Sequence, residues 1–219
     1  MEQAFKEKIK SQVLDFALDL LIIVILVFLI RSFLVAPFRV SGPSMCDTLN
    51  VIDGECVPNG NTVGEFILLN KLTYLFGEPQ RGDVVVFVPP GGELHYIKRI
   101  IGIGGDLIEV NSDGYIYITT SDDKRHRLKE PYLNAVNFGN TLPANELSRK
   151  FEVPDGKFFV MGDNRAHSSD SRHCFTSPTG CEKNDPRAFI GESDIDGKAL
   201  VTLWPFGNMK YIRRAEYGF

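Results

Sequence analysis

Residues 20–30 read Leu-Leu-Ile-Ile-Val-Ile-Leu-Val-Phe-Leu-Ile, an uninterrupted run of large apolar side chains. Extended to residues 16–36, the stretch contains only three polar residues. As a helix it would be about 31 Å long, close to the hydrocarbon thickness of a bilayer. A helix packed in a soluble core would normally show a polar face, and this run has none. We therefore predict a transmembrane helix near the N-terminus.

A cleavable signal peptide is the other alternative for this segment. Signal peptides have a shorter apolar region and a small-residue cleavage site, whereas this run continues into residues 35–38, Val-Ala-Pro-Phe, without one. Three lysines precede the span and two arginines follow it, which slightly favours a cytoplasmic N-terminus. We expect a cytoplasmic tail over residues 1–12, an anchor over 13–36 and an extracytoplasmic domain over 37–219.

The composition indicates that the rest of the chain is globular. Of 219 residues, 43% are hydrophobic and 24% charged, which excludes a disordered, collagenous or coiled-coil chain. The formal net charge of -4 argues against a general nucleic-acid binder. One domain with an appended anchor fits this length.

The domain is predicted to be mostly β. Short β-branched and aromatic runs alternate with Gly, Pro, Asn and Asp, and no βαβ alternation is visible. The expected strands cover residues 38–40, 66–69, 84–88, 96–103, 107–110, 115–120, 158–161 and 198–203. Helical signals are short, at residues 70–75 and 145–150. The chain turns polar over 111–155, which we interpret as an inserted β-ribbon subdomain.

The four cysteines all follow the apolar span, as two close pairs. In an oxidising compartment Cys46 with Cys56 and Cys174 with Cys181 would form two short-loop bridges. Spacing alone does not establish pairing, so free buried thiols remain an alternative. A zinc site from His173, Cys174 and Cys181 is a further alternative, although the spacing lacks a CxxC pattern.

A first candidate for chemistry lies just after the span, in residues 41–45, Ser-Gly-Pro-Ser-Met. A serine framed by Gly and Pro is held on a constrained turn, where its hydroxyl is exposed and its backbone N–H can face a reacting carbonyl. Taken alone, a segment of this kind is more often an ordinary turn. Residues 81–87, Arg-Gly-Asp-Val-Val-Val-Phe, follow as a turn that enters a buried strand, and we interpret them as structural.

Residues 96–106, Tyr-Ile-Lys-Arg-Ile-Ile-Gly-Ile-Gly-Gly-Asp, place a lysine inside an apolar strand. Side chains alternate along a strand, so Lys98 shares a face with Tyr96 and Ile100. Burial disfavours an ammonium, and a lysine whose pKa falls from about 10.4 to about 7–8 can act as a general base. The alternative is that Lys98 extends to solvent and Arg99 is a surface charge.

A polar loop follows a predicted strand at residues 162–172, Gly-Asp-Asn-Arg-Ala-His-Ser-Ser-Asp-Ser-Arg. Nine of the ten positions from Asp163 onward carry hydrogen-bonding side chains. Such a loop is either solvated or a network in which Asp170 pairs with Arg172 and a serine reaches a buried amine.

Together, these segments resemble the bacterial type I signal peptidases, membrane-bound serine proteases with a Ser-Lys dyad. The segments that carry the resemblance follow the anchor in order as SGPSM (41–45), RGDVVVF (81–87), YIKRIIGIGGD (96–106) and GDNRAHSSDSR (162–172). The likeness is weak through 111–155 and 173–219. It implies a signal-peptidase-like β fold and cleavage of signal peptides from exported preproteins after small residues, at Ala-X-Ala-like sites.

The resemblance also implies roles for particular residues. Ser44 would be the nucleophile and Lys98 the general base, with Ser168 hydrogen-bonded to the lysine amine. Supporting roles fall to the Asp170–Arg172 ion pair, to Asp163 and Asn164 in the same loop, and to Met45 beside the nucleophile.

The sequence departs from the family pattern in two places near the nucleophile. Some members carry a serine oxyanion donor two positions before it, where this chain has Gly42, with Ser41 one position further away. That leaves the backbone N–H of Ser44 as the first donor and the second donor open. The family commonly has Pro before Thr-Leu, whereas this chain has Cys46 and Asp47 there.

The expected partners are signal-peptide-bearing preproteins and the lipid bilayer, with no nucleic acid, and the chain is expected to be a monomer in the plasma membrane. The resemblance requires no metal and no organic cofactor. Apolar residues suited to the membrane interface are Phe33, Phe38, Trp204, Pro205 and Phe206, although a core role for Trp204 is an equal alternative. Two functional alternatives are a self-cleaving repressor-type Ser-Lys protease and a membrane-tethered, non-catalytic β-domain that binds an extracytoplasmic partner.

Overall fold

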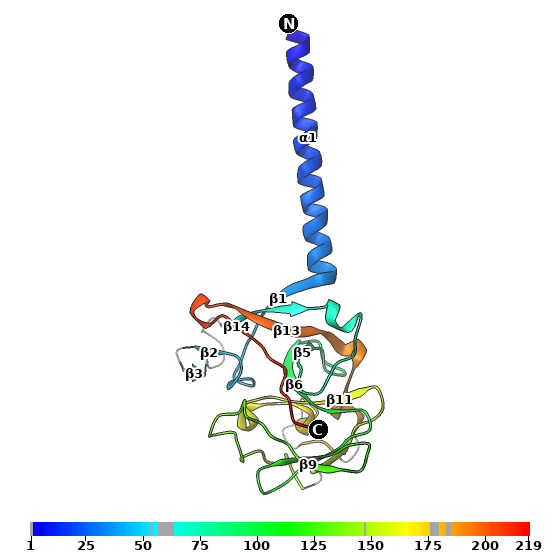
Figure 1. Ribbon diagram of the computed structural model, residues 1–219, viewed down its shortest axis with the longest axis vertical. Helices are drawn as coiled ribbons and strands as arrows, with labels where there is room; N and C mark the ends of the chain where they lie inside the picture. Colours follow the sequence, from blue (N-terminus) through cyan, green and yellow to red (C-terminus); the bar gives the residue numbers. More distant parts are fainter. Residues whose placement is uncertain (1, 53, 57–63, 147, 176–179, 183–184) are drawn as a thin grey trace.

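A computed structural model shows a long N-terminal helix joined to a β-rich domain (Figure 1). It describes the chain except for residues 1, 53, 57–63, 147, 176–179 and 183–184. Helix α1 (Glu2–Leu29) continues as a single π turn over Ile30–Leu34. The part that is long and apolar enough to cross a membrane is Gln12–Leu34.

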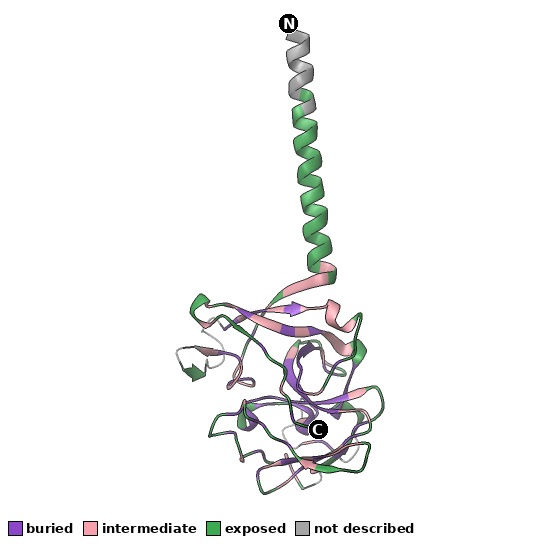
Figure 2. Cartoon of the chain, in the orientation of Figure 1, coloured by how far each residue is buried: buried purple, intermediate pink, exposed green. Residues whose placement is uncertain are grey.

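The helix stands away from the domain, and its apolar side chains are exposed over the span (Figure 2). An exposed apolar surface of this length suits the hydrocarbon interior of a bilayer. The apolar helical stretch ends at Leu34, two residues before the predicted end of the anchor at residue 36. Val35 and Ala36 begin strand β1 (Val35–Arg39), because their backbone pairs with β4 (Phe66–Asn70).

The domain is built on one antiparallel sheet, which confirms the mostly β prediction. Among the described residues its order is β1-β4-β13-β5-β6-β11-β12, with β14 paired to β13. The strands not yet given are β5 (Val84–Phe87), β6 (Tyr96–Ile103), β11 (Lys157–Met161), β12 (Ile190–Gly191), β13 (Ile195–Trp204) and β14 (Lys210–Tyr211).

The core explains why the central strands are apolar on both faces. All four residues of β5 and six successive residues of β6 are buried. One cluster lies around Met45, Ile67, Val84 and Ile97, and another around Phe87, Ile100 and Val160. A strand covered on both faces reads as a continuous apolar run, so a charge inside it must find a partner or lose its proton.

A second antiparallel sheet is inserted between β6 and β11, in the order β10-β7-β8-β9. Its strands are β7 (Leu107–Val110), β8 (Ile116–Thr119), β9 (Arg125–Arg127) and β10 (Lys150–Glu152). This differs from the ribbon predicted over 111–155. The insertion begins at β7, and Ile108, Ile118 and Phe151 pack with Phe159 of the main sheet in one core. The buried residues of its inner face alternate with polar residues, so the segment reads as polar on average although its inner face is buried.

The turn expected at residues 70–75 is confirmed as a single 3-10 turn, Leu72–Tyr74, with Thr73 N donating to Asn70 Oδ1 at 3.2 Å. The turn expected at 145–150 is shorter than predicted: Ser148 N donates to the Asn145 carbonyl at 3.2 Å, and Lys150 already begins β10, paired with Glu109. Two short strands that were not expected are β2 (Val51–Ile52) and β3 (Glu55–Cys56). Further 3-10 turns cover Arg165–His167, Ser171–His173, Pro186–Ala188, Glu192–Asp194 and Phe206–Asn208.

The cysteines form two disulfides, Cys46–Cys56 and Cys174–Cys181. The first joins the turn after Ser44 to β3, and the second closes a short loop beside the inserted sheet's core. Bonded sulfurs cannot act as thiolate ligands, so the zinc alternative at Cys174 and Cys181 is wrong.

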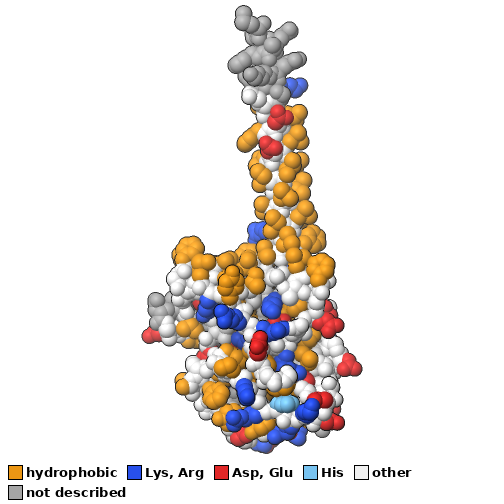
Figure 3. All heavy atoms as spheres, in the orientation of Figure 1, with side chains coloured by type: hydrophobic (Ala, Val, Ile, Leu, Met, Phe, Trp, Pro, Cys, Tyr) orange, Lys and Arg blue, Asp and Glu red, His pale blue; other side chains and the backbone are white. Residues whose placement is uncertain are grey.

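Apolar side chains also gather at the end of the domain where the helix joins it (Figure 3). Trp204 is 44% exposed and Phe206 74% exposed, and their rings meet edge to face at 5.0 Å. Phe33 at the end of the helix is likewise exposed. The exposure of Trp204 argues against the alternative in which it belongs to the core.

Candidate active site

The candidate nucleophile lies in a tight turn directly after β1. Cys46 N donates to the Pro43 carbonyl at 3.0 Å, and Leu49 N donates to that of Met45 at 2.8 Å. Gly42 has a φ of +82°, a conformation that costs glycine little. Met45 is fully buried in the core cluster of Ile67 and Val84, which anchors the turn and leaves the neighbouring Ser44 at the surface of a cleft.

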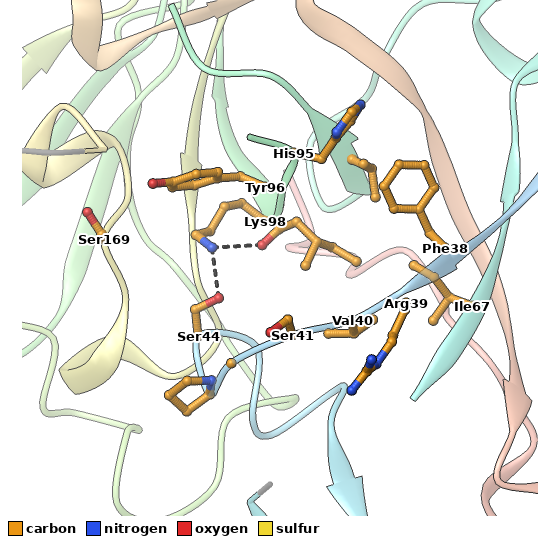
Figure 4. A pocket seen from close by; sticks show the side chains of 14 residues that line it. Phe38, Arg39, Val40, Ser41, Ser44, Ile67, His95, Tyr96, Lys98 and Ser169 are labelled. Carbon is orange, nitrogen blue, oxygen red and sulfur yellow. Dashed lines mark hydrogen bonds between the residues drawn. The ribbon is translucent and has the colours of Figure 1, made fainter. Parts of the chain in front are cut away.

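Lys98 reaches this serine from the middle of β6. Its Nζ lies 2.8 Å from Ser44 Oγ and donates to the Ile97 carbonyl at 2.9 Å (Figure 4). Only 3% of the lysine is exposed, so the alternative of a solvent-directed side chain is wrong. Strand alternation places Lys98 beside Tyr96, as predicted, and Nζ lies 5.3 Å from the centre of that ring.

The electrostatics around Lys98 favour the neutral amine. Burial lowers the pKa of Lys98 to about 8, although the negative charges of Asp170 and Asp163 oppose the shift. No carboxylate makes an ion pair with its Nζ in the part of the chain that the structure describes, so nothing close by fully compensates an ammonium. The amine can therefore exist as a base near neutral pH and take a proton from the serine hydroxyl.

The loop over 162–172 supports this pair from one side. Arg172 Nη2 lies 2.9 Å from Asp170 Oδ2, and the carboxylate also accepts from Gly162 N at 3.1 Å. Burial alone would raise the pKa of Asp170, but the Arg172 charge and His173 hold it well below its usual range. The predicted ion pair is thus present and buried, and it stabilises the turn that carries Ser168.

Ser168 does not make the predicted contact. Its Oγ is buried but has no hydrogen-bond partner among the described residues, because the Lys98 amine is directed to Ser44 and to the Ile97 carbonyl instead. Ser168 nevertheless lies beside the site. A Cβ at Gly162 would come within 2.2 Å of Ser168 Oγ and 2.4 Å of the Ser44 carbonyl oxygen, so only glycine fits between them.

Asp163 and Asn164 lie at different distances from the pair. Asn164 contacts the nucleophile turn directly: its Nδ2 donates to the Pro43 carbonyl and its N to that of Ser44, both at 3.1 Å. Asp163 lies one layer further away and forms a buried ion pair with Arg99 at 2.7 Å.

Several charged residues around the site were not predicted. Arg99 is buried, contrary to its interpretation as a surface charge, and Arg165 is buried against Glu130 of the insertion, with Nη1 2.9 Å from Glu130 Oε2. Two apolar neighbours on each side of Lys98-Arg99 were a usable signal that both side chains are enclosed. Glu130 carried no such signal, because it lies in a polar segment far from the loop in sequence.

An apolar cleft of about 310 Å³ opens beside the serine. Its walls come from β1, β4, β5 and β6, and the apolar lining residues are Phe38, Val40, Ile67, Val86 and Ile97. Ser41 and Ser44 lie on one side and Lys98 on the other (Figure 4). Strand β11 pairs with β6 only over Arg99–Ile103. Over residues 96–98, the edge of β6 that faces away from β5 therefore has no strand partner among the described residues.

Possible oxyanion donors lie at the rim of the same cleft. The Ser44 N–H makes no hydrogen bond within the described residues, and Ser41 is exposed. The described residues contain no group of three His, Cys, Asp or Glu side chains that could hold a metal ion. The arrangement offers a hydroxyl, an amine base and an apolar groove for an extended chain.

The chain joins a mostly β domain to an apolar helix, and it brings a serine and a buried lysine into contact at an apolar cleft. This is the architecture of a membrane-anchored serine peptidase. The family model for signal peptidase, peptidase S26, matches residues 13–204, and the chain belongs to this family. It is a serine endopeptidase that cleaves signal peptides from preproteins.

Two curated relatives match this chain over nearly its whole length. Signal peptidase I S of Bacillus subtilis strain 168 is 38% identical over 209 residues, covering 92% of this chain and 94% of the relative. Signal peptidase I P of Bacillus subtilis subsp. natto is 33% identical over 214 residues, covering 95% and 97%. A crystal structure of a signal peptidase I from Enterococcus faecalis V583 is 27% identical, covers 56% of this chain and 97% of that one, and has a TM-score of 0.37.

Proposed function

We propose that Ser44 is the nucleophile of this peptidase and Lys98 its general base. The observation that carries the proposal is the 2.8 Å contact between Lys98 Nζ and Ser44 Oγ, made by a lysine that is almost fully buried. A buried amine with a pKa of about 8 can hold a lone pair near neutral pH, which an exposed lysine cannot.

In the proposed reaction, neutral Lys98 takes the Ser44 proton as Oγ attacks the scissile carbonyl. The tetrahedral oxyanion is stabilised by the Ser44 N–H, with Ser41 or the Gly42 backbone as candidate second donor. Lys98 then gives the proton to the leaving amine, which departs as the mature protein's N-terminus. A water activated by the same lysine hydrolyses the acyl-enzyme on Ser44. Asp170, Arg172 and Asn164 act as supporting residues.

The cleft suits the specificity that the family resemblance implies. A signal peptide bound as an extended strand can pair with the free backbone edge beside Lys98 and place alternate side chains into the apolar cleft. Small apolar residues at the positions one and three before the cut, as in an Ala-X-Ala site, are what the family resemblance implies, and the apolar lining of the cleft suits them.

We propose that residues 1–12 lie in the cytoplasm and that the domain over 37–219 acts on the outer face of the plasma membrane as a monomer. Two disulfides in the domain fit an oxidising compartment. The exposed Trp204 and Phe206 lie at the turn between β13 and β14, which Figure 1 shows at the end of the domain that the helix joins, where they can contact lipid. Protease added to intact spheroplasts should digest the domain; protection from the protease would contradict this orientation.

The decisive experiment is cleavage of a preprotein with an Ala-X-Ala site by the detergent-solubilised chain. Ser44→Ala and Lys98→Ala should each abolish cleavage at the expected bond. The matched control is Lys124→Ala, which removes an exposed lysine that pairs only with Asp122 and should cleave like the unaltered chain. Full activity in either the Ser44 or the Lys98 variant would reject the dyad, whereas an inert unaltered chain would favour the alternative of a non-catalytic binding domain.

A further inference from the structure

A turn in the inserted sheet's connection, residues 134–137, presents hydrogen-bond donors to the nucleophile turn. The Asn134 side chain organises it: its Oδ1 accepts from Val136 N at 2.9 Å and from Asn137 N at 3.0 Å. With those groups occupied, the backbone N–H of Asn134 and the side-chain amide of Asn137 remain as outward donors. Asn137 is only 3% exposed, so its amide is fixed in the protein rather than free in solvent.

Both donors meet the carboxylate of Asp47, three residues after Ser44. Asn134 N donates to Asp47 Oδ2 at 2.8 Å, and Asn137 Nδ2 lies 3.2 Å from each carboxylate oxygen. Asp47 has a φ of +144°, which L residues rarely adopt. Such a backbone conformation persists only when surrounding contacts hold it. The hydrogen bonds from Asn134 and Asn137 to the Asp47 carboxylate can hold it in this way.

The same segment is also tied to the loop on the other side of the site. Arg165 Nη1 donates to Glu130 and to Thr141 Oγ1, both at 2.9 Å, on either side of the 134–137 turn. Arg165 directly follows Asn164, which binds the Pro43 and Ser44 carbonyls. The contacts therefore form a closed ring that runs from the nucleophile turn through the 162–172 loop and the insertion and back through Asp47.

We propose that Asp47 is a positioning residue for the nucleophile: clamped by Asn134 and Asn137 of the inserted sheet's connection, it holds the 44–48 turn so that Ser44 Oγ stays in contact with Lys98. The inference rests on the proposed roles of Ser44 and Lys98. Asp47 touches neither substrate nor reacting atoms and acts only through the turn. The insertion thereby contributes to catalysis without supplying a catalytic group.

The expected kinetic signature is a loss in kcat rather than in KM. The clamp does not line the substrate cleft, so binding of the signal peptide should be unaffected. A displacement of about 1 Å between reacting groups can cost up to about a hundredfold in rate. Asp47→Ala should therefore lower kcat by about ten- to a hundredfold while KM stays within about twofold.

Two conservative variants separate the clamp from a general effect on folding. Asn137 Oδ1 has no partner among the described residues, so its amide can turn over and accept a hydrogen bond from a new amide at position 47. Asp47→Asn should therefore retain most of the activity. Asn137→Asp opposes two carboxylates and should lower kcat as Asp47→Ala does. The double variant Asp47→Asn with Asn137→Asp restores an amide–carboxylate pair and should recover kcat.

The experiment measures kcat and KM for an Ala-X-Ala preprotein, using the full chain in detergent well below each variant's thermal midpoint. Asp122→Ala is the matched control, an exposed acid in the same insertion, and should behave like the unaltered chain. The proposal is overturned if Asp47→Ala keeps kcat within about twofold, or if the exchanged double variant is no better than Asn137→Asp alone. If the unaltered chain does not cleave or Ser44→Ala still does, the dyad itself has failed, which is a separate result.

Discussion

The two faces of strand β6 (Tyr96–Ile103) bury two neighbouring cations in opposite ways. Arg99 is 1% exposed and meets the Asp163 carboxylate at 2.7 Å, with the Tyr132 ring 4.1 Å from its guanidinium carbon. Lys98, one residue earlier and 3% exposed, has only a hydroxyl and a backbone carbonyl as hydrogen-bond partners among the described residues. Burial is nearly equal on the two faces, and the partner groups differ.

This difference separates a structural cation from a basic amine. A buried guanidinium keeps its charge because a carboxylate compensates the lost hydration. A buried amine without a close carboxylate loses part of its affinity for the proton, and its pKa falls to about 8. The fold therefore stabilises one cation and deprives its neighbour of a counter-charge, which is how a strand in the core can carry a base.

The largest expected effect comes from removing the amine. Lys98→Met should lower kcat/KM by about a hundredfold to ten-thousandfold, the usual contribution of a general base. The same variant should unfold at a higher urea concentration at pH 7. Because the pKa of Lys98 falls from 10.5 to about 8 on folding, the unfolded chain binds the proton more tightly, and the folded state is penalised by about 3 kcal/mol below pH 8. The penalty disappears as pH rises above 10.5.

Lys124→Met is the control for this pair of measurements. Lys124 is exposed, so its ammonium carries no desolvation penalty in the folded state, and replacing it should leave both kcat/KM and the urea midpoint unchanged. A Lys98→Met chain that is less stable than the unaltered one at pH 7 would show that the buried amine is well compensated, contrary to the comparison above.

On the opposite face, Arg99→Met should destabilise the protein by about 3–5 kcal/mol, because it leaves the Asp163 carboxylate buried without its partner. Arg125→Met is the matched control: Arg125 also contacts a carboxylate, Glu109 at 2.6 Å, but is about half exposed. It should cost no more than about 1 kcal/mol. Urea denaturation of both variants tests this, and equal losses would mean that burial does not distinguish the two pairs.

The pH dependence of kcat/KM should follow the state of Lys98. Activity should rise with pH and level off above about 8, where the amine is neutral. The negative charge of Asp170 raises the pKa of Lys98, so Asp170→Asn should shift the rising limb to lower pH by up to about one unit. An unshifted or upward-shifted limb in this variant would contradict that electrostatic coupling.

The smallest expected effect concerns the ring that covers Arg99. Tyr132 donates to Glu130 at 2.8 Å, and its hydroxyl lies 3.0 Å from that of Tyr217. Tyr132→Phe keeps the ring over the guanidinium and removes these bonds, so it should lower the unfolding free energy by about 1–2 kcal/mol. Thermal or urea unfolding measures this change in unfolding free energy, and activity is expected to remain. If Tyr132→Phe lost as much unfolding free energy as Arg99→Met, the hydroxyl of Tyr132 rather than its ring would be the main stabilising contact.

Much of the fold could be predicted from local pattern. The strands over 96–103 and 107–110 have the predicted limits, because β-branched runs between turn residues are a local property. The face of Lys98 followed from alternation along the strand. The size and packing of the inserted sheet could not be predicted, since its buried residues alternate with polar ones and lose their signal when averaged.

The site shows the same division. The Asp170–Arg172 pair, two residues apart, was predicted, whereas Glu130–Arg165 and Asp47–Asn137 join segments that are 35 and 90 residues apart. The predicted contact of Ser168 with Lys98 is wrong, because two acceptors nearer the amine decide its direction. Hydrogen-bond partners depend on displacements of less than an ångström, which a sequence pattern does not specify.

The sequence by itself determined an apolar N-terminal span, a β-rich domain, a serine on a constrained turn and a lysine on the same strand face as Tyr96 and Ile100, because each depends on composition or on short-range periodicity. Only the tertiary structure decided which buried cation received a carboxylate and which received a hydroxyl. Arg99 and Asp163 are 64 residues apart and Lys98 and Ser44 are 54 apart, so their meeting depends on how β6, the nucleophile turn and the 162–172 loop pack together.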